Sequence, residues 1–135
     1  MKIDLENINP GTWFDFSDGE GRICLRICAI EDLELIRKQT RKKKIEYKRG
    51  QRFEYEEINN RLEDDKVWDF AIMDWKGVYD ADDKEIKCTK ENKIMLMRQS
   101  VEFANFIAKC LEDLEKIIGR ENEEAEKNSE TSQDG

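Results

Sequence analysis

Histidine is absent from this chain of 135 residues. Its absence removes the commonest general base and metal ligand, and with them every Ser/His or Cys/His catalytic arrangement. Long apolar runs are also missing, since no stretch approaches the roughly 20 apolar residues that span a bilayer. The first residues, MKIDLENINP, lack the basic and apolar regions of a signal peptide. We therefore expect a soluble, intracellular protein that is not an enzyme and carries no cofactor.

Apolar residues are also few for a globular chain. They make up 38% of the sequence and charged residues 41%, so part of the chain must lie outside any core. The length suits one compact domain, which we place at 1–119, followed by a disordered acidic tail at 120–135 that lacks large apolar residues. The four cysteines are expected to be reduced thiols.

The cationic residues cluster in one segment. Residues 37–52 hold nine of the 24 Lys and Arg residues against one acid, Glu46, for a local charge of +8 that leaves −16 on the remainder. This basic segment could contact nucleic acid phosphates or an acidic partner. It could equally be a solvated loop or exposed helix turn that pairs with the chain's own acidic residues.

The N-terminal part predicts a β-hairpin at about 11–30. Aromatic residues precede the turn residues Ser17, Asp18 and Gly19, and the run ICLRIC then alternates apolar residues with Cys and Arg. Cys24 and Cys28 would lie roughly 13 Å apart on a strand at about 3.3 Å per residue, too far to share a zinc ion. A short helix is expected from Glu31, where acids come first and cations last.

Three further helices are predicted, at about 53–76, 89–98 and 100–118. Apolar spacings of three to four suggest the first, with Trp68 and Trp75 in the core and Gly77 as its end. Thr89 and Ser100 are expected to cap the other two. The last helix has the widest apolar stripe in the chain, which could pack on the same molecule or seat a partner helix, and Gly119 is expected to end it.

The acidic run DADDKE, residues 80–85, has three interpretations. As an EF-hand loop it would place Lys84 in the calcium shell and Glu85 where glycine is required. As a catalytic pair of carboxylates it has no positioning partner that the sequence reveals. We therefore predict a tight, solvated turn. Together with the elements above, this gives an α+β fold in which an N-terminal β-hairpin is followed by a mainly helical portion.

The order of features in this chain resembles that of tail assembly chaperones of long-tailed bacteriophages and prophages. The resemblance covers about 10–118 and is carried by the WFDF/RICLRI hairpin, MDWKGVYD, the acidic turn, EIKCTKENK and the final FANFIAKCLEDLEKI helix. One departure is the absence of a glycine near Asp83 or Lys84. Such proteins bind the helical tape-measure protein and keep it soluble until tail tube subunits polymerise around it.

The resemblance implies a chaperone of the bacterial host cytoplasm. Its partners would be the tape-measure protein and, as a second candidate, the tail tube protein, with self-association left open. The residues expected to bind the partner are Met97, Phe103 and Phe106 together with the basic run Arg41, Lys42, Lys43 and Lys44. The alternatives are another phage-encoded structural or interaction protein, or a nucleic-acid-binding regulator that uses the basic segment. The charge of −16 elsewhere disfavours nucleic acid.

Overall fold

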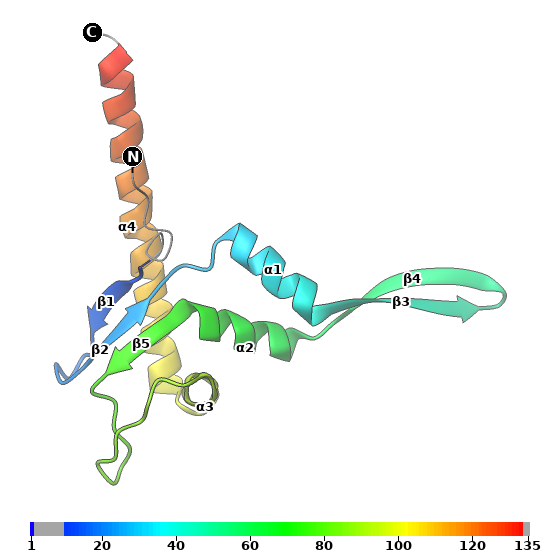
Figure 1. Ribbon diagram of the computed structural model, residues 1–135, viewed down its shortest axis with the longest axis horizontal. Helices are drawn as coiled ribbons and strands as arrows, with labels where there is room; N and C mark the ends of the chain where they lie inside the picture. The colour runs from blue at the N-terminus through cyan, green and yellow to red at the C-terminus, as the bar shows by residue number, and fades with distance from the viewer. Residues whose placement is uncertain (2–9, 134–135) are drawn as a thin grey trace.

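The computed structural model describes residues 1 and 10–133, with side chains described as far as Arg120. It has the predicted α+β class, with N-terminal strands followed by helices (Figure 1). In chain order the elements are β1 (Thr12–Asp15), β2 (Arg22–Leu25), α1 (Ile30–Thr40), β3 (Arg41–Lys48), β4 (Gln51–Ile58), α2 (Asn60–Ala71), β5 (Ile72–Lys76), α3 (Lys90–Gln99) and α4 (Val101–Gln133). No helix in the described part of the chain is both long and apolar enough to cross a membrane.

The N-terminal hairpin belongs to a three-stranded antiparallel sheet of order β1-β2-β5. The predicted hairpin and the helix that follows it are confirmed. Both faces of β2 are covered, because Ile23, Cys24 and Leu25 are all buried, so its alternation of apolar residues with Cys and Arg does not separate a core face from a solvent face. The central strand is covered on both sides, and the Cys24 thiol lies 3.6 Å from the Pro10 carbonyl oxygen.

The core lies between the sheet and α4. Six of its buried residues form one cluster: Ile23, Leu25, Ile72, Trp75, Ile107 and Cys110. The Trp75 indole N–H also donates a hydrogen bond to the Ile86 carbonyl oxygen at 2.7 Å. The polar group of this buried side chain therefore has a hydrogen-bond partner. Trp75 is therefore a core residue, as predicted, whereas Trp68 is half-buried beneath the Arg98 guanidinium, 5.0 Å from the ring centroid.

The predicted helix at 53–76 is wrong at both ends. Residues 51–58 form β4, and the chain leaves α2 directly into β5 at Ile72. Period-two alternation explains β4, because Phe53 and Tyr55 lie on one face of the strand. The preceding Arg49–Gly50 pair has φ values of 52° and 76°, which are those of the two-residue turn that joins hairpin strands. Residues 37–40 of the basic segment are thus the last turn of α1, and the rest is the strand β3 with the tip of the hairpin, not a loop.

The acidic run forms the predicted tight turn. Tyr79 and Glu85 bridge across it, and the Asp80 carboxylate accepts hydrogen bonds from the backbone N–H groups of Asp82 (2.9 Å) and Lys84 (3.0 Å). Asp83 takes the left-handed conformation with φ 59°, the place where a glycine was expected. Aspartate tolerates this conformation better than most residues, which accounts for the missing glycine.

The caps of the last two helices are confirmed, but the end of the final helix is not. Thr89 accepts a hydrogen bond from the Asn92 N–H, and Ser100 from the Phe103 N–H. The helix α4 continues past Gly119, because one glycine costs only about 1 kcal/mol and the Glu, Ala and Lys residues beyond it favour helix. Residues 134–135 lie outside the described part, and the disorder predicted for 120–135 stays a prediction.

The four cysteines carry free thiols, and burial raises the pKa of each. For Cys88 the pKa rises to about 11. We expect native Cys88 to react slowly with iodoacetamide at pH 8, and its rate to rise roughly tenfold per pH unit toward pH 11, because the thiolate is the nucleophile. Mass spectrometry of alkylated peptides measures this rate, with urea-unfolded protein as the control. Rapid alkylation of native Cys88 at pH 8 would contradict the assignment.

Candidate functional site

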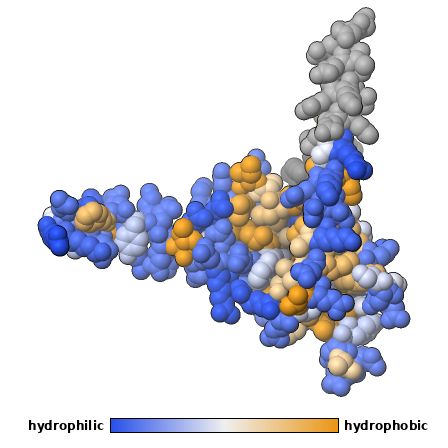
Figure 2. Space-filling view, turned by 180° about the vertical axis from the view of Figure 1, so that it is seen from behind, coloured by the Kyte–Doolittle hydropathy of each residue, from blue (hydrophilic) through white to orange (hydrophobic). Residues whose placement is uncertain are grey.

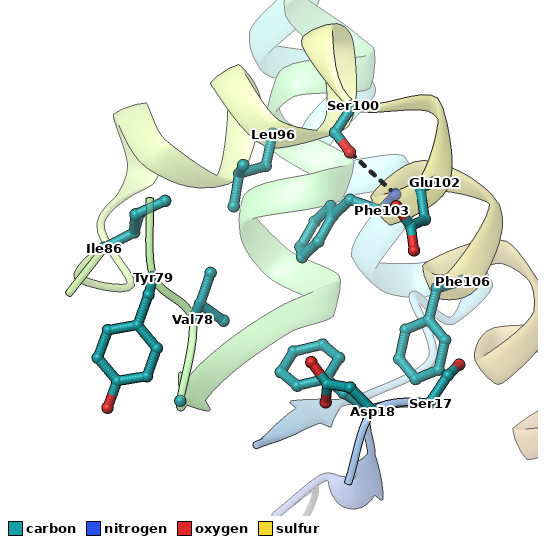
Figure 3. Close-up of a pocket in the computed structure, with 12 residues that line it drawn as sticks. Ser17, Asp18, Val78, Tyr79, Ile86, Leu96, Ser100, Glu102, Phe103 and Phe106 are labelled. Atoms are coloured by element: carbon teal, nitrogen blue, oxygen red, sulfur yellow. Dashed lines mark hydrogen bonds between the residues drawn. The ribbon is translucent and has the colours of Figure 1, made fainter. Parts of the chain in front are cut away.

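A pocket of about 320 Å³ opens between the sheet and the last two helices. Its apolar walls come from Phe16, Val78, Ile86, Leu96, Phe103 and Phe106. Figure 3 shows Val78, Phe103 and Phe106 around a shared hollow, with Asp18 and Glu102 at its margins. The volume is at the lower end of small-ligand sites, roughly 300–1,000 Å³. A pocket of this size suits one or two large side chains of a partner.

The two phenylalanines of α4 are held by the core on one side. The Phe103 ring packs edge-on against Trp75 with centroids 5.8 Å apart, and Phe106 lies 5.4 Å from Phe16. The Ser100 hydroxyl caps α4 by accepting a hydrogen bond from the N–H of Phe103, the third residue of the helix, and so fixes the first helical turn on which Phe103 lies. Both rings are half-buried and line the pocket, which gives them a rigid backing and an accessible edge.

The margin of the pocket is acidic. Asp18 in the β1–β2 turn and Glu102 in the first turn of α4 are both exposed. Glu102 is favourably placed there, because a carboxylate near a helix N-terminus interacts with the partial positive charge of the helix dipole. Tyr79, which is 58% exposed, adds an aromatic side chain to the same margin. The pocket therefore favours an apolar group flanked by positive charge.

The structure brings together two of the predicted partner-binding residues. Phe103 and Phe106 line the pocket, but Met97 packs half-buried against the core cluster. Leu96, the residue before Met97, lines the pocket instead. Successive helix residues differ by about 100° in direction, so the sequence alone could not decide which of the two faces the pocket.

The predicted basic residues Arg41, Lys42, Lys43 and Lys44 lie elsewhere, on β3. The strands β3 and β4 form a separate two-stranded sheet, here called the arm, which projects away from the rest of the molecule (Figure 1). At its base Arg41 lies 3.5 Å from the Glu63 carboxylate, and farther out Lys44 pairs with Glu57. The structure thus separates the basic run from the apolar pocket.

Several apolar side chains of the arm are exposed to solvent. From the cross-strand register, Ile45, Tyr47 and Ile58 share one face, whereas Phe53 and Tyr55 share the other. All five are at least 46% exposed. Figure 2 shows the arm as a mainly hydrophilic projection in which isolated hydrophobic side chains reach the surface. The signals for this hairpin in the sequence are the alternating β-formers and the Arg49–Gly50 turn, which a prediction from charge alone does not use.

Comparison with models of known protein families gives a match to a prophage family. A model of the family described as YdaY prophage protein matches residues 30–128, which include α1, the arm, α2, β5, α3 and most of α4. None of the curated proteins and none of the solved structures matches the chain. The matched region includes the arm and the α3–α4 wall of the pocket. Because the match covers well over half of the chain, the chain belongs to the YdaY prophage protein family.

Proposed function

We propose that this prophage protein is a non-enzymatic tail assembly chaperone that binds the tape-measure protein in the bacterial host cytoplasm and keeps it soluble during tail morphogenesis. The observation that supports the proposal is the apolar pocket with an acidic margin, formed where α4 meets the sheet. The resemblance to tail assembly chaperones supplies the identity of the client. The tail tube protein is a further candidate partner.

The chemistry of the pocket specifies the kind of segment it would take. A tape-measure protein presents amphipathic helices, and a helix bound in an apolar site anchors itself through a few large side chains. Here the anchor would rest against Phe103 and Phe106, and a Lys or Arg one helical turn away would meet Asp18 or Glu102. The small pocket supports a reversible contact, which a chaperone that must release its client requires.

Nucleic acid binding is the less favoured use of the basic residues. The arm contains seven Lys and Arg residues but also four Glu residues, so its net charge is +3 and the rest of the chain carries −11. Glu57 already pairs with Lys44, and Glu54 pairs with Arg52. Binding to DNA would have to overcome these carboxylates and the charge of the body.

The test is co-expression with the tape-measure protein of the same prophage, followed by size-exclusion chromatography. We expect the two proteins to co-elute. The double variant Asp18→Lys, Glu102→Lys should reduce the co-eluting fraction at least roughly tenfold, because it reverses the charge that meets a cationic client. A tape-measure protein that precipitates beside the folded wild-type chain would overturn the proposal.

The matched control is the double variant Asp113→Lys, Glu115→Lys, which makes the same charge change at two exposed positions of α4 that do not line the pocket. This variant should retain the client as the wild type does. Equal losses in the control and the pocket variant would mean that overall charge, and not the pocket, governs binding. Circular dichroism of both variants checks that α4 remains helical.

A further inference from the structure

The arm is a two-stranded sheet whose strands are almost wholly exposed. Every residue from Lys42 to Ile58 is exposed, and the base of the arm is held by Arg41 against Glu63 and by the hydrogen bond from the Asn59 N–H to the Thr40 carbonyl oxygen, 3.2 Å long. An isolated hairpin is marginally stable in water and usually needs a third element on one face or edge. The exposed apolar side chains of the arm provide a surface for such an element.

The tip of the arm joins an aromatic ring to positive charge. Tyr47, 72% exposed, lies directly across from Arg52 on one face. Arg52 lies 2.9 Å from the Glu54 carboxylate in an exposed ion pair, and such a pair contributes at most about 1 kcal/mol, so the guanidinium can exchange Glu54 for a carboxylate of another molecule. Arg49 occupies the turn itself and pairs with no carboxylate among the side chains that the structure describes. Lys48 is adjacent, with Glu46 as a distant partner at 3.7 Å. The tip thus carries a large, rigid, amphipathic side chain surrounded by cations.

The pocket has the opposite character, with an aromatic interior and an acidic margin. We infer that the arm tip of one copy docks in the pocket of a second copy, with Tyr47 against Phe103 and Phe106 and with Arg49 and Arg52 facing Asp18 and Glu102. Tyr and Arg are the residues most enriched at interface centres, and a phenol ring fits a hollow of about 320 Å³. The two surfaces match in size and in aromatic content, and their charges are of opposite sign.

The partner is a second copy because an arm cannot reach the pocket of its own chain. Figure 1 shows the arm leading away from the β1–β2 turn and from α3, which border the pocket. The charges favour the same partner, since an arm of +3 meets a body of −11 on another copy, although the whole molecules repel at −8 each. The association should therefore be weak and depend on the local match at the tip.

Docking of the arm would cover the apolar pocket until another ligand displaces it. The inference uses the pocket but does not depend on which client the pocket serves. It is tested on this chain alone, so a failed co-expression with the tape-measure protein leaves it unaffected.

The experiment reverses the charge of the tip in one variant and of the pocket in another. Sedimentation velocity over a concentration series then measures the mass of the associated species. The tip variant is Arg49→Glu, Arg52→Glu, and the pocket variant is Asp18→Lys, Glu102→Lys. We expect the wild type to associate with increasing concentration and less so in high salt, and each variant alone to associate at least roughly tenfold more weakly. An equimolar mixture of the two variants should associate again, because each acidic tip then meets a basic pocket.

A further pair of variants separates the tip face from the rest of the arm. Tyr47→Ser should weaken association, whereas Tyr55→Ser, on the opposite face, should leave it unchanged. A wild type that stays monomeric at every concentration would overturn the inference. So would variants that associate as the wild type does, or a mixture that fails to restore association.

Discussion

The Ile107→Ala variant is expected to lose about 2–5 kcal/mol of the free energy of unfolding. Ile107 is 2% exposed and joins α4 to the core residues of the sheet, including Ile72 and Leu25. The substitution removes buried carbon atoms and leaves a cavity in the contact between helix and sheet. The core of the described part has only ten buried hydrophobic residues, so few neighbouring side chains can shift to fill that cavity.

Urea denaturation followed by tryptophan fluorescence measures the loss, since Trp75 lies in the same cluster. The matched control is Ile118→Ala, three helical turns later on α4, where the side chain is 38% exposed. The control should lose less than about 1 kcal/mol, because most of its surface is already in contact with water. Comparable losses at both positions would show that α4 is not anchored through Ile107.

Local signals account for the elements that the sequence predicted. The N-terminal hairpin follows from aromatic and β-branched residues around a Ser-Asp-Gly turn, and α3 and α4 follow from the capping residues Thr89 and Ser100. In each case the decisive interactions lie within a few residues along the chain. The stripe of α4 likewise predicted its buried face, with Ile107, Cys110 and Leu114 in the core.

The missed elements depend on pairing between distant segments. Residues 72–76 have apolar spacings that suit either a helix or a strand, and the pairing of Trp75 with Ile23 decides for the strand. Similarly, the β-formers and the Arg49–Gly50 turn are local signals for the hairpin, but which β4 residue each lysine from Lys42 to Lys44 faces is set by the register between the strands. Local sequence reasoning has no access to such partners.

The candidate site was half predicted for the same reason. Phe103 and Phe106 were found because they lie on the α4 stripe. The opposite wall comes from Phe16, Val78 and Ile86, which belong to turns and short extended segments without periodicity. These residues reach the pocket through the β2–β5 pairing, so the acidic margin at Asp18 became visible only in three dimensions.

The Gly77→Ala variant is expected to lose about 2–5 kcal/mol of the free energy of unfolding. Gly77 has φ +77°, and a left-handed L-residue costs about 1–2 kcal/mol. An added Cβ would also overlap the Glu20 carbonyl oxygen and lie 2.8 Å from the Gly21 Cα. Both obstacles are backbone atoms that cannot rotate away, so overpacking adds about 1–3 kcal/mol.

Gly19→Ala separates the two causes, because Gly19 has φ +73° and open space where its Cβ would lie. It should lose only the conformational part, about 1–2 kcal/mol. The difference between the two variants therefore measures how closely the β1–β2 turn approaches the end of β5. That approach also brings Asp18 and Val78 to the same pocket. Gly77→Ala should therefore weaken client binding and self-association together, while Gly19→Ala should weaken neither. Equal stability losses in the two variants would mean that the turn and β5 do not meet as the structure has them.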